Sequence, residues 1–254
     1  MSIMNSDKKL LLDVRNLDKS YDGKSLAVNK LNLQVFEGDF VILLGLSGSG
    51  KSTMLRCINR LIEPTSGDID FRGENILNLS GLKLRQYRRR IAMVFQQFNL
   101  VKNLSVLTNV LTGRLGYHSV MSPFSKEDHD YAMHNLKRVG LQDYAHRQVK
   151  HLSGGQQQRV GIARALMQDP ALILADEPVA SLDPATADSI MQYLGEINRE
   201  GISIICSLHF LSLARRYGNR VLALKDGQKV FEGLPSEIDN QRFKTIYGQD
   251  AEEI

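Results

Sequence analysis

The sequence predicts an α/β protein in which strand and helix patterns alternate along one chain of 254 residues. Three observations support this prediction. An antiparallel β pattern opens the chain, an apolar strand then leads through a glycine-rich loop into a helix, and a helix-rich segment separates two buried-strand patterns. We therefore expect one domain over residues 10–254, with a helical subdomain at residues 99–164 inserted within it.

The first elements are read from hydrophobic periodicity. Leu10–Leu17 and Ala27–Phe36 alternate apolar and polar residues on either side of a turn at Asp22–Gly23, which predicts an antiparallel β layer able to cover one side of a nucleotide. Phe40–Leu44 is an unbroken apolar run, typical of a buried strand. A helical pattern follows over Thr53–Leu61.

The later segments are predicted to form further helices and strands. Lys83–Arg90 contains five Lys or Arg residues without an interleaved aromatic ladder, which favours a solvated helix face over a nucleic-acid site. Lys126–Val139 is typical of an amphipathic helix within the inserted segment. Further strands are predicted over Asp68–Phe71, Leu172–Ala175, Ser203–Ser207, Val221–Lys225 and Lys229–Phe231, the last two joined by a turn at Asp226–Gly227.

Composition and charge narrow the class of protein. With 43% hydrophobic and 24% charged residues the chain is near the average of globular proteins, and its formal charge of +4 fits an anionic ligand without demanding nucleic acid. No apolar stretch approaches the roughly 18 residues of a membrane span. The first nine residues lack the apolar centre of a secretory signal, and Cys57 and Cys206 are too few for a disulfide framework. These features predict that the protein resides in a reducing cytoplasm.

The glycine-rich loop carries the first chemical motif. Residues 45–52 read Gly-Leu-Ser-Gly-Ser-Gly-Lys-Ser, the pattern of a phosphate-binding loop, between a strand and a helix as that motif requires. Glycines let backbone N–H groups close around phosphate oxygens, Lys51 can neutralise the β- and γ-phosphates, and the Ser52 hydroxyl suits Mg²⁺. The candidate phosphate-binding residues are Gly45, Ser47, Gly48, Ser49, Gly50, Lys51, Ser52 and Thr53.

Two adjacent carboxylates end the apolar strand at Leu172–Ala175. Successive strand residues point in opposite directions, so Asp176 and Glu177 are expected to do different work. We expect Asp176 to hold Mg²⁺, directly or through water, and Glu177 to polarise the water that attacks the γ-phosphate. An isolated Asp-Glu pair is more often a solvated turn, but the phosphate loop favours the catalytic interpretation.

A third glycine-rich element, Leu152–Gln156, precedes an apolar-periodic segment at Arg159–Leu166. Its glycines and the amino end of the next helix form a second anion-binding end, yet the chain has one phosphate loop, so the anion must come from elsewhere. Leu-Ser-Gly-Gly-Gln between a phosphate loop and the carboxylate strand resembles the signature of ATP-binding cassette (ABC) ATPases. This resemblance implies a RecA-like P-loop NTPase core with an antiparallel β subdomain and an inserted helical subdomain.

The resemblance covers about residues 12–232 and assigns further roles. Tyr21 matches the aromatic residue that stacks on adenine, and Gln96 matches the Q-loop glutamine that senses Mg²⁺ and links the core to the helical subdomain. Asp183 matches the D-loop that crosses the dimer interface, and His209 matches the switch histidine that contacts the γ-phosphate. Taken alone, each of these residues would have an ordinary structural explanation.

The resemblance also implies cofactors and partners. ATP and Mg²⁺ are the expected cofactors, and two copies of the chain are expected to pack head to tail, with each ATP between the phosphate loop of one copy and Ser153, Gly154, Gly155 and Gln156 of the other. Hydrolysis would open this dimer and drive two transmembrane permease subunits, contacted by about Phe98–Leu115. The resemblance further implies an extracytoplasmic solute-binding protein as a partner. It places the chain on the cytoplasmic face of the inner membrane, and no nucleic-acid partner is expected.

Two departures from the family pattern stand out. Phe210 follows His209 where family members commonly carry Asp, so any hydrogen bond from that Asp is missing. The sequence also lacks a counterpart of the extra regulatory domain that many sugar-importer subunits append, and we expect none.

The transported solute is indicated only by resemblance. The stretches Ile58–Gly67, Phe95–Val101, Leu111–His118 and Asp176–Asp183 are most similar to phosphonate importer ATPases, and the string Gly113–His118 lies where a membrane partner is expected. Importers of phosphite or of polar amino acids are alternatives. A soluble ABC ATPase acting on nucleic acid is disfavoured by the single cassette and the lack of heptads. A phosphate-loop kinase would leave Leu152–Gln156 and Asp183 unexplained.

Overall fold

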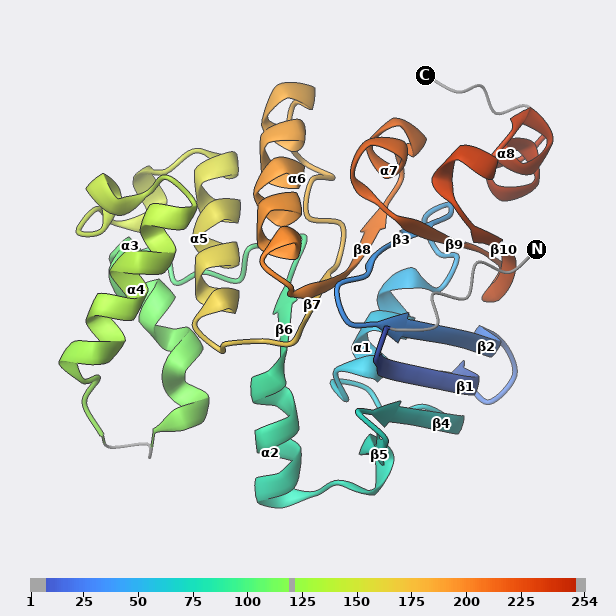
Figure 1. The fold of residues 1–254 in the computed structure, drawn as a ribbon, viewed down its shortest axis with the longest axis horizontal. Coiled ribbons are helices and arrows are strands. Elements are labelled where there is room, and N and C mark those ends of the chain that lie inside the picture. Colours follow the sequence, from blue (N-terminus) through green and yellow to red (C-terminus); the bar gives the residue numbers. More distant parts are fainter. Residues whose placement is uncertain (1–7, 119–121, 250–254) are drawn as a thin grey trace.

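Two β-sheets of different construction lie together at one end of the molecule, and a group of helices extends from the other (Figure 1). The computed structural model describes residues 8–118 and 122–249, so residues 250–254 of the expected domain lie outside it. The strand order is β2-β1-β4-β5 in the first sheet and β10-β9-β3-β8-β7-β6 in the second. The mixed α/β class is therefore as expected.

The first sheet is the antiparallel layer predicted at the N-terminus. It consists of β1 (Leu10–Ser20), β2 (Leu26–Phe36), β4 (Ser66–Phe71) and β5 (Glu74–Asn75). β1 pairs with both β2 and β4, and it continues three residues beyond the predicted end because Lys19 and Ser20 still pair with β2. Irregular register near the end of β1 hides these pairs from a strict alternation pattern.

The second sheet forms the centre of the core. Its strands are β3 (Phe40–Leu44), β6 (Ile91–Val94), β7 (Leu172–Ala175), β8 (Ser203–Leu208), β9 (Arg220–Lys225) and β10 (Gln228–Gly233). All neighbours run parallel except β10, which is antiparallel to β9. Every residue of β3 is buried because both faces of a parallel sheet are covered. Parallel strands bring the carboxyl ends of β3, β7 and β8 to one edge.

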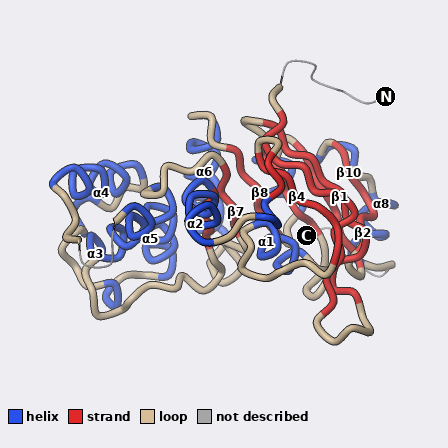
Figure 2. Tube along the Cα trace, turned by 90° about the horizontal axis from the view of Figure 1, so that it is seen from below, coloured by secondary structure: helices blue, strands red, loops and turns tan. Residues whose placement is uncertain are grey.

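Helices cover this sheet and build the inserted segment. The α-helices are α1 (Lys51–Ile58), α2 (Gly81–Arg90), α3 (Val106–Leu111), α4 (Lys126–Arg138), α5 (Gly154–Leu166), α6 (Pro184–Arg199), α7 (Leu211–Tyr217) and α8 (Asn240–Tyr247). Short 3₁₀ helices span Ile76–Asn78, Thr112–Tyr117, Gln142–Tyr144, Val149–His151 and Pro235–Glu237. In both views α3, α4 and α5 gather apart from the sheets, with α6 beside them (Figures 1 and 2). No helix of the described ranges 8–118 and 122–249 is long and apolar enough to cross a membrane.

Two expectations from the sequence need correction. The helix after the phosphate loop ends at Ile58 rather than Leu61, because Arg60 takes a left-handed conformation with φ 53°. The solvated face expected over Lys83–Arg90 is only partly right: Arg85 donates to the carbonyls of Leu115, Gly116 and His118 at 2.6–3.0 Å. Arg85 thus joins α2 to the inserted segment through partners that are distant in sequence.

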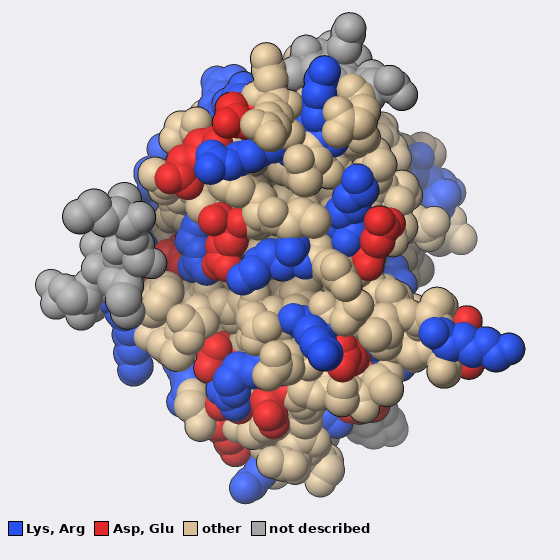
Figure 3. Space-filling model, turned by 90° about the vertical axis from the view of Figure 1, so that its right-hand side faces the viewer, with Lys and Arg blue, Asp and Glu red and all other residues tan. Residues whose placement is uncertain are grey.

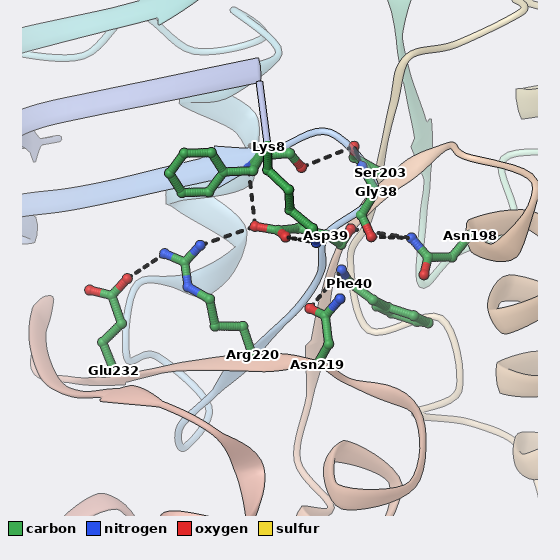
Figure 4. A network of polar contacts seen from close by, with 10 residues as sticks. Lys8, Gly38, Asp39, Phe40, Asn198, Ser203, Asn219, Arg220 and Glu232 are labelled. Carbon is green, nitrogen blue, oxygen red and sulfur yellow. Dashed lines mark hydrogen bonds and ion pairs between the residues drawn. The ribbon is translucent and has the colours of Figure 1, made fainter. Parts of the chain in front are cut away.

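A buried carboxylate, Asp39, joins the two sheets where β2 leads into β3 (Figure 4). Its oxygens accept from Lys8 and Arg220, each at 3.1 Å, and from the N–H of Phe36 at 3.0 Å. Ser203 accepts from the N–H of Gly38 at 2.9 Å beside it. Because a buried charge needs such partners, this network fixes the start of β3 relative to the antiparallel sheet.

Candidate nucleotide-binding site

The loop between β3 and α1 has a backbone that only glycine fits at two positions. Gly45 has φ 145°, and a Cβ there would lie 2.2 Å from the carbonyl oxygen of Leu224. Gly50 has φ 102°, and its Cβ would lie 2.4 Å from the carbonyl oxygen of Ala27. No acidic side chain lies in the first turn of α1, and Gly50 provides no side-chain cap. The amino end of α1 can therefore receive an anion.

Lys51 lies inside this loop, with only 3% of its surface exposed. Its Nζ donates to the carbonyls of Gly45 at 2.7 Å and Leu46 at 3.0 Å, and it lies 3.8 Å from Oε1 of Glu177. Burial lowers the pKa of Lys51, while the charges of Glu177 and Asp176 oppose that shift. The ammonium group is thus held at the loop between backbone carbonyls and a carboxylate.

Ser52 and Asp176 meet although 124 residues separate them. The Ser52 hydroxyl donates to Oδ1 of Asp176 at 2.7 Å, and the Asp176 N–H donates to the carbonyl of Val94 at 2.8 Å. A hydroxyl and a carboxylate at hydrogen-bond distance are hard oxygen donors, and Mg²⁺ takes few protein ligands when phosphates and water supply the others. The residues present therefore fit the magnesium site expected from the sequence.

Glu177 occupies the same edge in an unusual conformation. Its φ of 47° is left-handed, and its Oε1 lies 2.7 Å from Nε2 of His209. The expected strand alternation does not extend to Asp176 and Glu177, because β7 ends at Ala175 and both carboxylates lie on the turn that follows. The left-handed turn, rather than strand alternation, separates the two side chains.

Tyr21 and Gln96 lie at the margin of the site. Tyr21 is 63% exposed, and its hydroxyl lies 3.2 Å from that of Thr53 in the first turn of α1. Gln96 is exposed just beyond β6, whose last residue, Val94, pairs with Ala175. Tyr21 thus presents an exposed ring next to the loop, with Lys19 Nζ 5.2 Å from the ring centroid, and Gln96 follows the strand adjacent to the carboxylates.

The signature residues are placed elsewhere. Ser153 and Gln156 form a capping box on α5: the Ser153 hydroxyl accepts from the Gln156 N–H at 3.3 Å, and the Gln156 side chain accepts from the Ser153 N–H at 2.9 Å. Gly154 is exposed, and Gly155 packs against Thr186. In both views α6 stands between α5 and α1 (Figures 1 and 2). The chain therefore does not bring its signature to its own phosphate loop.

Asp183 provides the cap of α6. It accepts from the N–H of Thr186 at 3.0 Å, and hydrogen bonds from Thr186 hold the pKa of this carboxyl below its usual value. Asp183 is also exposed, close to the signature because Gly155 packs on Thr186. The two motifs thus share one face near the start of α5 and α6.

The structure adds two residues that the sequence reasoning missed. Arg56 lies one turn after Ser52 on α1, and its guanidinium is 3.7 Å from Oδ2 of Asp176. The i,i+4 spacing from Ser52 could have indicated it. Ser207, buried in β8 two residues before His209, contacts both Asp176 and Glu177. Its position two residues before His209 in the sequence could have indicated that Ser207 belongs to the site.

Comparison with known proteins identifies the family of the chain. The family model described as ABC transporter matches residues 28–180. The chain belongs to this family. The phosphonates import ATP-binding protein PhnC of Bdellovibrio bacteriovorus is 52% identical over 250 residues, with 96% of each chain covered. The protein of the same name from Bacillus thuringiensis is 48% identical, with 95% of this chain and 96% of the relative covered.

Solved structures of ABC cassettes share the fold. A dimeric post-hydrolysis ATP-binding cassette bound to ADP and Pi superposes with a TM-score of 0.78 at 38% identity, covering 89% of this chain and 99% of that one. CbiO1 of Clostridium perfringens, part of an ABC transporter complex, gives a TM-score of 0.83 at 30% identity, covering 94% of each chain. The P-loop ABC ATPase fold expected from the sequence is confirmed.

Proposed function

We propose that this chain is the ATP-hydrolysing subunit of an ABC importer for phosphonates or related reduced phosphorus compounds. The decisive observation is that Lys51, Ser52, Asp176 and Glu177 converge at one sheet edge beside the phosphate loop. The near full-length identity to phosphonate import ATP-binding proteins supports the importer and the solute class.

Nucleotide binding follows from the loop and its surroundings. The adenine ring would stack on exposed Tyr21, and the loop N–H groups would surround the phosphates. The Lys51 ammonium contacts backbone carbonyls and Glu177 in the structure, and it would instead pair with the γ-phosphate when ATP binds. Ser52 and Asp176, with Gln96 nearby, would hold Mg²⁺, which neutralises phosphate charge when bound.

Hydrolysis is assigned to Glu177 and His209. Glu177 would accept a proton from the water that attacks the γ-phosphorus, while the bond to the β-phosphate oxygen breaks and ADP and phosphate leave. His209 Nε2 lies 2.7 Å from the Glu177 carboxylate, so it can orient this base and contact the γ-phosphate. Lys51 would then stabilise charge on the transferred phosphoryl group.

A second copy of the chain completes each site. Ser153 and Gln156 satisfy one another on the surface, so the N–H groups at the amino end of α5 face outward. Packing two copies head to tail would place these residues, with Gly154, Gly155 and the D-loop Asp183, against ATP held by the other copy. Dimeric cassettes among the similar structures support this arrangement.

The membrane partners are assigned to the inserted segment. Val101, Leu104 and Leu115 are large apolar side chains that remain exposed within Phe98–Leu115. Each of these exposed apolar side chains would be suited to burial against another protein. Two permease subunits would dock here, and an extracytoplasmic binding protein would deliver the solute. The chain would lie on the cytoplasmic face of the inner membrane.

Phosphite and polar amino acids are the alternative solutes, and a soluble ABC ATPase on nucleic acid is the alternative role. Figure 3 shows Lys and Arg interspersed with Asp and Glu over one face, without a continuous basic surface there. The relatives named for phosphonate import favour an importer of phosphonates or related reduced phosphorus compounds over these alternatives.

The test is the ATPase rate of the chain purified with its permease subunits and binding protein. Phosphonate should stimulate the rate, and Lys51→Ala should abolish both basal and stimulated turnover. Stimulation by phosphite alone would narrow the solute to that reduced phosphorus compound, and stimulation by an amino acid alone would replace the solute assignment. A complex that hydrolyses ATP without responding to any of these solutes would contradict the importer assignment.

A further inference from the structure

Ser207 occupies a central place that no motif of the sequence marked. It lies in β8, fully buried, between β7 on one side and β3 on the other. β8 pairs with β3 through Ser207 and Leu43, and with β7 through Cys206 and Ala175. The strand that leads to His209 therefore runs directly beside the strands that lead to the phosphate loop and to the two carboxylates.

The Ser207 hydroxyl contacts the turn that carries both carboxylates. Its Oγ accepts from the N–H of Glu177 at 2.8 Å. Its single proton can go to Oδ1 of Asp176 at 3.3 Å or to the carbonyl oxygen of Ala175 at 3.5 Å. One buried hydroxyl thus contacts three successive residues, Ala175, Asp176 and Glu177.

This contact matters because the turn is strained. Glu177 has φ 47°, a conformation that residues with a side chain rarely adopt. The N–H of Glu177 donates to Ser207 Oγ, while the carbonyl of Glu177 accepts from Ala180 at 3.3 Å. Without the hydroxyl, the N–H of Glu177 would lose its partner and the turn would lose a restraint on the Glu177 side chain.

The strand that carries this hydroxyl also leads to His209. His209 follows Ser207 by two residues, and its Nε2 lies 2.7 Å from Glu177 Oε1. Ser207 also shares Oδ1 of Asp176 with Ser52, so it can retain that carboxylate when Ser52 turns to a metal ion. The Ser207 hydroxyl thus links the peptide of Glu177 to the strand that leads to His209.

We infer that Ser207 is a positioning residue for ATP hydrolysis: its hydroxyl holds the Glu177 turn at the distance from His209 that hydrolysis requires. The inference rests on the ATP hydrolysis proposed above and adds a residue that acts through Glu177 and Asp176. Ser207 does not contact nucleotide in this account, so its loss affects turnover rather than binding.

Ser203 offers a matched control on the same strand. It is equally buried, and its hydroxyl also accepts one backbone N–H, that of Gly38 at 2.9 Å, and points to one carbonyl, that of Phe36 at 3.4 Å. It lies at the opposite end of β8, in the Asp39 network of Figure 4. Ser203→Ala therefore removes a comparable buried hydroxyl away from the carboxylates.

The experiment compares Ser207→Ala, Ser207→Thr and Ser203→Ala in the complex with permease subunits, measuring kcat, KM, the ATP dissociation constant and the melting temperature. Ser207→Ala should lower kcat about 10- to 100-fold, since small displacements of catalytic groups have effects of that size. Its ATP dissociation constant should stay within about threefold of wild type, because the phosphate loop is unchanged. Ser207→Thr keeps the hydroxyl and should restore most of kcat. Ser203→Ala should lower the melting temperature as much as Ser207→Ala does, with kcat near wild type.

Three results would overturn the inference. Ser207→Ala could hydrolyse ATP at the wild-type rate, Ser203→Ala could lose as much kcat as Ser207→Ala, or Ser207→Thr could be as slow as Ser207→Ala at an unchanged melting temperature. Each leaves the proposed function intact because the wild-type complex still turns over. A wild-type complex that does not hydrolyse ATP would instead remove the proposed function itself.

Discussion

The two halves of the nucleotide site differ in how the fold builds them. At the carboxyl edge of the core, Ser52 reaches Asp176 across 124 residues, and Lys51 is buried beside Glu177. At the signature, Ser153 and Gln156 bond to one another, three residues apart. The first half is prepared by tertiary packing within one chain. The second is a self-sufficient helix end on the surface, suited to being offered to a partner.

Glu177→Gln should have the largest effect, since it removes the proposed base from the prepared half. We expect kcat to fall about 10²- to 10⁴-fold, the usual contribution of a general base. ATP binding should be retained because Gln keeps the size of Glu and Lys51 is untouched. Single-turnover hydrolysis and nucleotide titration would check both values. A Gln variant with normal turnover would exclude Glu177 from its role.

Ser153→Arg tests the other half. The new side chain is bulky, charged and without a cap for α5, so closure of two copies should be blocked and the ATPase rate should fall at least about tenfold. ATP binding to a single copy should not change, as measured by titration with a fluorescent ATP analogue. Ser153→Thr keeps the cap and serves as the control. If the Arg variant lost nucleotide binding as strongly as it lost ATPase activity, the signature would belong to the nucleotide site of its own chain.

Tyr21→Ala tests a weaker contact of the first half. Loss of the exposed ring should raise the ATP dissociation constant about threefold to tenfold, the range expected for one aromatic stacking contact. Tyr21→Phe keeps the ring, loses the hydroxyl near Thr53, and should bind ATP nearly as well as wild type. If Phe were as weak as Ala, the hydroxyl rather than stacking would carry the contact.

Phe210→Asp should have the smallest effect and the opposite sign. Phe210 is 53% exposed at the N-cap of α7 and makes no side-chain cap there. Asp at this position can accept from the first turn, which should raise the free energy of unfolding by about 1 kcal/mol. Calorimetry should show a melting temperature higher by about 2–4 °C. ATPase activity should be retained, and a large loss would show that the switch next to His209 has diverged.

The sequence was most informative where local pattern and tertiary environment agree. The bounds of β3 and β7 were predicted to the residue, because strands buried on both faces read as continuous apolar runs. The partners of Arg85 and of the Ser207 hydroxyl lie on segments far along the chain. The left-handed Glu177 is likewise invisible in the pattern Leu172–Glu177, because strain is imposed by the surrounding fold.

The division of the site between two copies is tested most directly by the mass of the Glu177→Gln protein in light scattering, with ATP and with ADP. Because this variant should bind ATP without hydrolysing it, we predict twice the monomer mass in ATP and the monomer mass in ADP. Adding Ser153→Arg should return the mass in ATP to that of the monomer. A monomer in saturating ATP, with nucleotide demonstrably bound, would contradict the account.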